Sequence, residues 1–233
     1  MKIFLLGDSL SRGILFDSER SKFMIAKEAF FNLLKPRINA EVENISKLGQ
    51  TLDTAVLELD RKISKTRPDI VAIELGGNDC DFDWDAVSRD PDAEHICRTP
   101  FEKFEDGIRN LVCRLKSEGI IPVLINLPPI DADRYFTYFC RGCSTMEEKV
   151  LSFLGNISRI YWWHERYSSV LGLIAEETDT PLIDIRSAFM HKEDYRKYLC
   201  DDGIHPNKEG HKLIAERISE LVSHKYSEIL LPS

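Results

Sequence analysis

The sequence lacks any apolar run of the ~18 residues that a membrane-spanning helix needs, so we expect no transmembrane segment. It also lacks an excess of basic residues, because 31 Lys and Arg stand against 39 Asp and Glu and the formal net charge is −8. Such a chain has no general attraction for nucleic-acid phosphates or for an anionic membrane surface. We therefore expect neither nucleic acid nor membrane among its partners.

Cysteine is too sparse for a small disulfide framework, since only six occur in 233 residues. A reducing, cytoplasmic location is the simpler expectation. Cys140 and Cys143 form a lone C-x-x-C pair, and zinc would need two further ligands at matching spacing. We interpret the pair as structural. The apolar stretch at the N-terminus ends at Gly7-Asp8 and is too short for a signal peptide, so we expect no export unless a leader has been removed.

Repeats and linkers are also missing, and the length predicts one domain over residues 1–233. Short apolar runs predict five strands, at 3–6, 42–45, 70–75, 120–127 and 182–185. Helical periodicity separates these runs. Strand–helix alternation predicts a parallel sheet with helices on both faces.

Three helices have clear patterns. Apolar residues at helical spacing cover 52–63, 101–115 and 213–221. We expect Thr99 to cap the second helix, with Pro100 in its first turn and Glu102 completing a capping box. Asn207 is the expected N-cap of the last helix.

Parallel sheets of this kind place their sites beyond the C-terminal ends of the strands. Residues 7–9, 47–49 and 76–79 follow the first three predicted strands. The long segments 79–99 and 128–156 follow the third and fourth strands and are rich in aromatic residues. We therefore expect them to form walls or a lid over the same edge.

Four short blocks at these places resemble the GDSL/SGNH hydrolase family. They are the Gly-Asp-Ser-Leu at 7–10, the glycine at 49, the Gly-Gly-Asn-Asp at 76–79 and the Asp-Gly-Ile-His-Pro at 202–206. The blocks occur in order and extend over nearly the whole chain. The resemblance implies a flavodoxin-like three-layer α/β/α sandwich with a five-stranded parallel sheet, and it implies ester hydrolysis.

The resemblance also assigns roles to residues. Ser9 is the expected nucleophile, although a serine after a strand can also serve only as a helix cap. His205 is the expected general base, and Asp202 would orient it, with the adjacent Asp201 as a competitor. The oxyanion hole would consist of the backbone N–H groups of Ser9 and Gly49 and the side-chain amide of Asn78. Gly49 is alternatively a simple turn residue, and Asp8 has no expected role beyond shaping its turn.

Two further patterns each allow two interpretations. Aspartates alternate from 79 to 85, as at the start of a calcium loop. Such a loop needs Gly at its sixth position and Glu at its twelfth, but counted from Asp79 these positions hold Trp84 and Asp90. We read this segment as a solvated acidic loop, with a weak cation site as the alternative, and we expect no metal and no cofactor. Residues 161–167 are dense in aromatic rings, which either pack in the core or line a substrate pocket.

The leading hypothesis is a serine esterase that acts on a small-molecule ester with a short acyl group. An O-acetyl group on a carbohydrate is a substrate that the resemblance alone suggests. The alternatives are a thioesterase or lysophospholipase, a metal-dependent phosphoesterase, and a binding module that has kept a hydrolase fold. A homodimer is common for domains of this kind, but no surface patch in the sequence indicates one.

Overall fold

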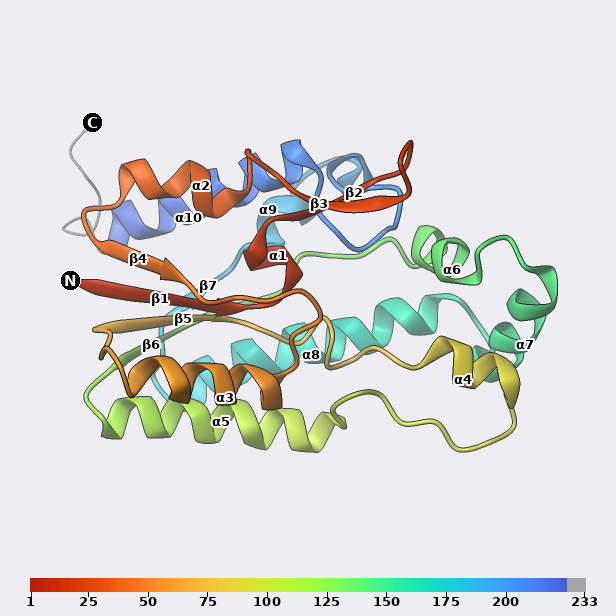
Figure 1. Cartoon of the computed structure of the whole chain (residues 1–233), viewed down its shortest axis with the longest axis horizontal. Helices are drawn as coiled ribbons and strands as arrows, with labels where there is room; N and C mark the ends of the chain where they lie inside the picture. Colours follow the sequence, from red (N-terminus) through yellow and green to blue (C-terminus); the bar gives the residue numbers. More distant parts are fainter. Residues whose placement is uncertain (226–233) are drawn as a thin grey trace.

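The central sheet has five parallel strands, and this computed structural model describes residues 1–225. The strands are β1 (Lys2–Gly7), β4 (Glu41–Asn44), β5 (Ile70–Glu74), β6 (Ile121–Ile125) and β7 (Leu182–Ile183). They lie in the order β4-β1-β5-β6-β7 (Figure 1). This is the flavodoxin-like order, with the first strand in the interior of the sheet. The predicted five-stranded parallel sheet is confirmed, with each strand within the predicted run or a residue or two of it.

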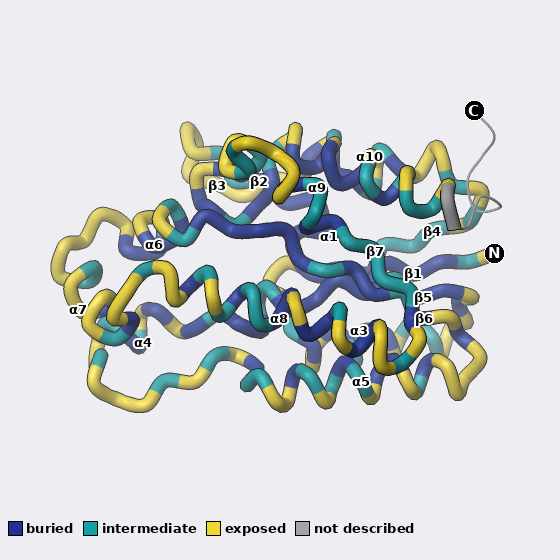
Figure 2. The backbone as a smooth tube through the Cα atoms, turned by 180° about the vertical axis from the view of Figure 1, so that it is seen from behind, coloured by how far each residue is buried: buried dark blue, intermediate teal, exposed yellow. Residues whose placement is uncertain are grey.

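Helices cover both faces of the sheet, as predicted. One layer contains α3 (Leu52–Ile63), α5 (Phe101–Ser117) and α8 (Ser158–Glu177). The other contains α2 (Phe30–Leu34), which the 3₁₀ turn η1 (Lys35–Arg37) continues, together with α9 (Arg186–Met190) and α10 (Lys208–Lys225). Figure 2 shows the strands buried between helices whose outer faces are exposed.

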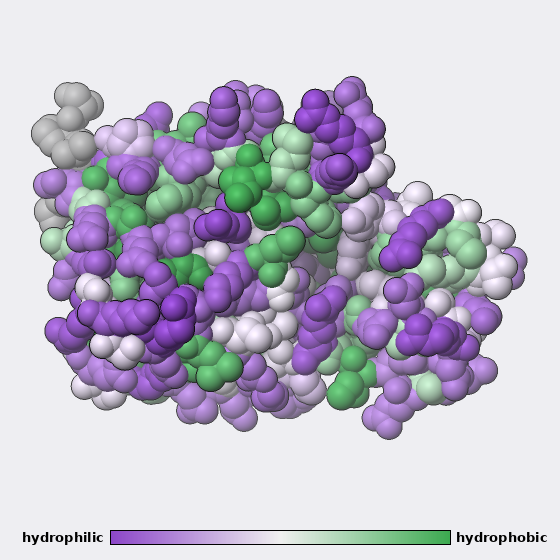
Figure 3. All heavy atoms as spheres, viewed as in Figure 1, coloured by the Kyte–Doolittle hydropathy of each residue, from purple (hydrophilic) through white to green (hydrophobic). Residues whose placement is uncertain are grey.

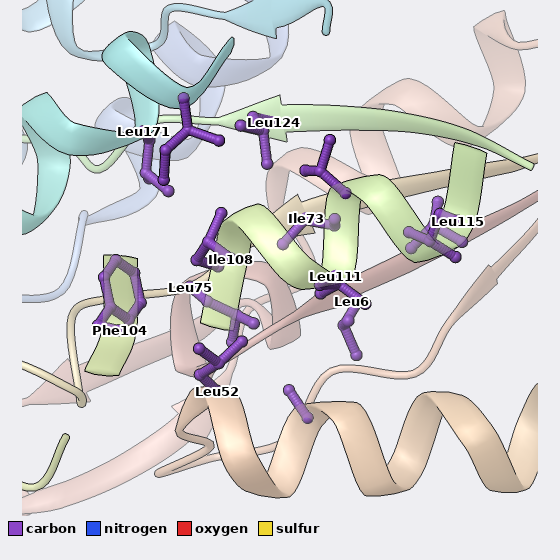
Figure 4. Packing of buried hydrophobic residues seen from close by; sticks show 14 of the residues in the cluster. Leu6, Leu52, Ile73, Leu75, Phe104, Ile108, Leu111, Leu115, Leu124 and Leu171 are labelled. Atoms are coloured by element: carbon purple, nitrogen blue, oxygen red, sulfur yellow. The ribbon is translucent and has the colours of Figure 1, made fainter. Parts of the chain in front are cut away.

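Strand β1 shows why its run at 3–6 has no polar position. Phe4 and Leu6 belong to the core beneath α3, α5 and α8, whereas Leu5 packs in the core on the opposite face. Successive side chains of a strand point to opposite faces, so a strand covered on both sides is expected to be mostly apolar. Figure 4 shows Leu6 and Ile73 of the strands meeting Leu111 of α5 in the first of these cores.

A third apolar cluster lies beyond the C-terminal edge of the sheet. It joins α4 (Trp84–Arg89), α6 (Ala132–Cys140) and α7 (Ser144–Leu154) to the start of α8 (Figure 1). The rings of Trp84 and Phe139 stack with centroids 4.4 Å apart. Segments 79–99 and 128–156 thus pack against each other beside the site edge. That they act as walls or a lid for a substrate stays a prediction.

Two local predictions about helix starts have opposite outcomes. Asn207 caps α10, since its Oδ1 accepts from the backbone N–H of Gly210 at 3.0 Å. The predicted cap of α5 is wrong: the helix starts at Phe101 with Pro100 before it, and no side chain caps it. Thr99 instead donates its hydroxyl to the buried carboxylate of Asp79 at 2.6 Å. The Thr99 hydroxyl is therefore bonded to an acceptor elsewhere in the chain and does not cap the helix as the local pattern predicted.

The sequence patterns also missed a hairpin. After the short helix α1 (Ser9–Arg12), strands β2 (Ile14–Asp17) and β3 (Lys22–Ile25) pair antiparallel beside the main sheet. All four residues of β3 are exposed, so the strand has no polar–apolar alternation to reveal it. A second 3₁₀ turn, η2 (Tyr195–Tyr198), precedes the loop that leads into α10.

The outer surface in Figure 3 is mostly hydrophilic, with small separate apolar patches. Such patches are ordinary on a protein surface. Within residues 1–225, no helix combines the length and the apolarity needed to cross a membrane.

The two leucines of α3 at 57 and 59 offer a matched test of the core. Leu59 is fully buried beneath the sheet, whereas Leu57 is 69% exposed. We expect Leu59→Ala to lower the free energy of unfolding by about 2–5 kcal/mol, because it leaves a cavity. Leu57→Ala should change it by less than about 0.5 kcal/mol. Urea denaturation measures both, and similar losses would contradict this packing of α3.

Candidate active site

Ser9 lies at the first turn after β1, in the interior of the sheet. Asp8 caps this turn, because its Oδ1 accepts from the backbone N–H of Leu10 at 2.9 Å. The cap is therefore Asp8, and Ser9 keeps its hydroxyl free for another partner. Gly7 is required here, since a Cβ at this position would lie 2.6 Å from the hydroxyl oxygen of Ser11.

His205 links Ser9 to a buried carboxylate. Its Nε2 lies 2.9 Å from Ser9 Oγ, and its Nδ1 lies 2.6 Å from Asp202 Oδ2. Asp202 is fully buried, and its Oδ1 also accepts from the backbone N–H of His205 at 3.1 Å. The competing Asp201 is exposed. The structure thus brings together the three residues that the sequence proposed, in the expected hydrogen-bonded order.

Gly203 holds the loop that carries this pair. Its φ is +78°, a conformation that favours glycine, and a Cβ would lie 2.5 Å from the carbonyl oxygen of Asp131. Its own carbonyl accepts from the backbone N–H of Asp131 at 2.8 Å, and Cys200 donates to the carbonyl of His205 at 2.7 Å. The loop between η2 and α10 is therefore tied both to itself and to the start of α6.

Asn78 lies beside Ser9, in the loop after β5. Its amide Nδ2 donates to Asp8 Oδ2 at 2.9 Å. An amide nitrogen carries two hydrogens, so one remains for another acceptor. Asp8 thus contacts both the nucleophile's turn and the amide assigned to the oxyanion hole, a positioning contact that the sequence did not predict.

Gly49 lies in the turn after β4, at the same edge of the sheet. The turn is tied to the end of β1, since the backbone N–H of Lys47 donates to the carbonyl of Gly7 at 3.2 Å. Gly49 is exposed with a φ of +72°, and a Cβ there would meet nothing within 4 Å. It does not line the cavity described next. Its place in the oxyanion hole stays a prediction.

Ser9, Asn78 and His205 open into a small cavity of about 90 Å³. Its far wall is mostly apolar and includes Leu127 and Trp163. Sites for drug-sized ligands are typically ~300–1,000 Å³, so this cavity suits only a small group. Residues of the aromatic segment 161–167 therefore lie in two environments. Trp163 and His164 line the cavity, whereas Tyr167 packs in the core.

Buried carboxyls lie close to Ser9, and one of them, Glu74, had no role predicted from the sequence. Glu74 ends β5 with 1% exposure and accepts from the Ser11 hydroxyl at 2.8 Å. Burial, together with the nearby Asp8, holds the pKa of Glu74 well above its ordinary value. Burial also raises the pKa of Asp8. A lone acidic residue in a strand buried on both faces was the available signal.

Two aspartates of the acidic loop after β5 accept hydrogen bonds from other parts of the protein. Asp83 caps α4 by accepting from Ala86 at 2.8 Å, and Asp81 accepts from the Tyr135 hydroxyl at 2.8 Å. In the part of the chain described, no group of three or more His, Cys, Asp or Glu side chains is placed to hold a metal ion. Cys140 and Cys143 are both free thiols, and burial raises the pKa of Cys140 to about 11.

A doubly wound parallel sheet with Ser, His and Asp in hydrogen-bonded series at its C-terminal edge is the arrangement of a serine hydrolase. The chain belongs to the GDSL-like lipase/acylhydrolase family, which it matches over residues 3–218. It is thus an ester hydrolase of the GDSL type, and the implied fold and family are confirmed.

Curated relatives agree with this family. The chain is 26% identical to the thioesterase 1/protease 1/lysophospholipase of Escherichia coli, over 95% of this chain and 85% of that protein. It is 24% identical to an arylesterase of Vibrio mimicus, over 96% and 89%. A GDSL esterase/lipase of Oryza sativa subsp. japonica is 24% identical over 69% of this chain, which spans only 56% of that longer protein.

Solved structures show the same fold. A lipase/acylhydrolase from Enterococcus faecalis superposes with a TM-score of 0.65 at 19% identity, over 100% of this chain and 98% of that one. A catalytic mutant of an acetylxylan esterase from Geobacillus stearothermophilus gives 0.64 at 18% identity, over 94% and 92%.

Asp79 yields a prediction about stability and pH. It is fully buried, its Oδ2 has no hydrogen-bond partner, and burial raises its pKa from 3.8 to about 6. Between pH 4 and 6 the folded state therefore binds more protons at Asp79 than the unfolded state, so this residue lowers stability as pH rises. Asp79→Asn keeps the acceptor oxygen and removes the titration.

We expect wild type to lose up to about 3 kcal/mol relative to Asp79→Asn between pH 4 and pH 7. Urea denaturation at each pH measures the difference, in which the other titrating groups cancel. Parallel stability curves for the two proteins would contradict the raised pKa.

Proposed function

We propose that this chain hydrolyses short-chain carboxylic esters through an acyl-serine intermediate. The observation that carries the proposal is the hydrogen-bonded series from Ser9 Oγ through His205 to Asp202, with distances of 2.9 and 2.6 Å. A serine hydroxyl is a weak nucleophile unless an adjacent base takes its proton. A buried carboxylate fixes the tautomer of that base and stabilises its charged form.

The proposed reaction has two similar halves. Ser9 Oγ attacks the ester carbonyl carbon while His205 Nε2 takes its proton, and the resulting oxyanion accepts from the backbone N–H groups of Ser9 and Gly49 and from Asn78. His205 then returns the proton to the leaving alcohol as the carbon–oxygen bond breaks. Water repeats the attack on the acyl-serine, which releases the acid and restores Ser9.

The cavity supports a short acyl group. Its volume of about 90 Å³ adjoins Ser9, and buried apolar side chains such as Leu127 and Ile160 line it. The similar fold of an acetylxylan esterase makes O-acetyl groups on carbohydrates a candidate substrate class. The Escherichia coli relative keeps thioesterase or lysophospholipase activity as the second candidate. A cytoplasmic location stays a prediction from cysteine content.

The nucleophile is tested with p-nitrophenyl acetate, butyrate and octanoate. We expect wild type to hydrolyse acetate and butyrate faster than octanoate, because the cavity is small. Ser9→Ala should lower kcat by about 10⁴-fold or more, and EDTA should have no effect. Labelling of Ser9 by a fluorophosphonate probe provides a second measurement of its reactivity.

Each other outcome identifies an alternative. Activity that survives Ser9→Ala or disappears with EDTA would favour a metal-dependent phosphoesterase. A preference for octanoate or for acyl thioesters would favour the thioesterase or lysophospholipase reading. A folded protein with neither activity nor labelling would be a binding module.

The adjacent aspartates provide a matched pair for the role of Asp202. We expect Asp202→Asn to lower kcat by about 10³–10⁴-fold, because an amide at this position favours the wrong tautomer of His205. Asp201→Asn should stay within about twofold of wild type, since Asp201 is exposed. Steady-state kinetics on p-nitrophenyl acetate separates the two, and equal losses would refute the assignment.

A further inference from the structure

The hairpin of β2 and β3 brings an aromatic ring onto the catalytic histidine. The ring of Phe23 in β3 meets the ring of His205 edge to face, with centroids 5.3 Å apart. Phe16, its cross-strand partner, lies 5.6 Å from Phe23, and Tyr138 of α6 lies 5.0 Å from Phe16. Three rings from three elements thus form a continuous surface that begins at His205.

Phe16 helps to anchor the hairpin, because it packs against the buried cluster of Leu15, Ala26 and Ala29. Phe23 does not belong to that cluster. Phe23 is 43% exposed, and Ile25 on the same face of β3 is 57% exposed. An aromatic ring left half open beside a reacting group is available to a ligand, whereas a core ring is not.

The chemistry decides which half of an ester would meet these rings. His205 Nε2 delivers a proton to the leaving alcohol, so the alcohol must lie on the His205 side of Ser9. The cavity that Asn78 and Trp163 line extends from Ser9 and is also lined by His205, and we assign the acyl group to it. Phe16, Phe23 and Tyr138 do not line that cavity. The two halves of the substrate would therefore meet different walls.

We propose that Phe23, with Phe16 and Tyr138, forms the subsite for the alcohol half and selects esters of apolar ring alcohols. This assignment rests on the proposed serine-esterase function. A ring alcohol can pack edge to face or offset on Phe23 and remove exposed apolar surface from water. A small aliphatic alcohol such as ethanol is too short to cover the same rings.

The test compares benzyl acetate with ethyl acetate, which share the acyl group and a similar leaving oxygen. We expect Phe23→Ala to lower kcat/KM for benzyl acetate by about three- to tenfold more than for ethyl acetate, the range that one aromatic contact provides. Phe23→Leu should recover part of the preference. The ratio of ethyl acetate to ethyl butyrate should not change, because Phe23 lies outside the acyl cavity.

Two further variants make the result specific. Met24→Ala changes the neighbouring residue of β3, which points to the other face and is 37% exposed, so it should leave both ratios unchanged. Trp163→Ala should change the acetate-to-butyrate ratio but not the benzyl-to-ethyl ratio. These variants separate the alcohol wall from the acyl wall.

An unchanged benzyl-to-ethyl ratio in Phe23→Ala would overturn the subsite; if both activities fell equally, Phe23 would only support His205. A wild-type preference for acetylated sugars over benzyl acetate would overturn it too. In both cases Ser9-dependent hydrolysis persists and the proposed function stands. Absence of Ser9-dependent hydrolysis of every ester would instead overturn the proposed function, and the alcohol subsite with it.

Discussion

The hydrogen bond between His205 Nε2 and Ser9 Oγ is the contact on which the rest of the site depends. It joins residues 196 positions apart, across the first strand and the last loop of the fold. An interior strand, β1, positions Ser9, and a loop stabilised by contacts of Gly203 and Asp202 positions His205. A hydrogen bond tolerates only a few tenths of an ångström, so both supports must be rigid.

That rigidity has an electrostatic cost around Ser9. Asp8, Glu74 and Asp79 are all buried, and burial raises the pKa of each of these carboxyls. Asp8 nevertheless performs two positioning tasks at once, capping the turn of Ser9 and holding the amide of Asn78. Because both carboxylate oxygens of Asp8 are hydrogen-bonded, its burial specifies one geometry, so some stability is exchanged for a defined site.

The surroundings of Ser9 differ on its two sides. One side opens into the small cavity with Trp163 in its wall, and beside His205 lies the exposed aromatic surface of the hairpin and α6. The cavity is lined by the loops at the sheet edge, by Tyr135 of α6 and by the first half of α8, whereas Phe23 comes from the two-stranded hairpin that follows Ser9. In the proposed function, acyl size and alcohol character are thus controlled by separate parts of the chain.

Local pattern was enough for the five strands and for helices α3, α5 and α10, and the family resemblance of short blocks was enough for Ser9, Asp202 and His205. A strand buried on both faces is mostly apolar, and each of these blocks is contiguous in sequence. The 20-residue helix α8 was not predicted. Tertiary structure alone decided that Thr99 bonds Asp79 instead of capping α5, that Glu74 lies close to the site, and that Phe23 reaches His205. It also decided the volume of the cavity. Each of these features depends on contacts between residues distant in the chain, and a local periodicity carries no information about which distant groups will meet.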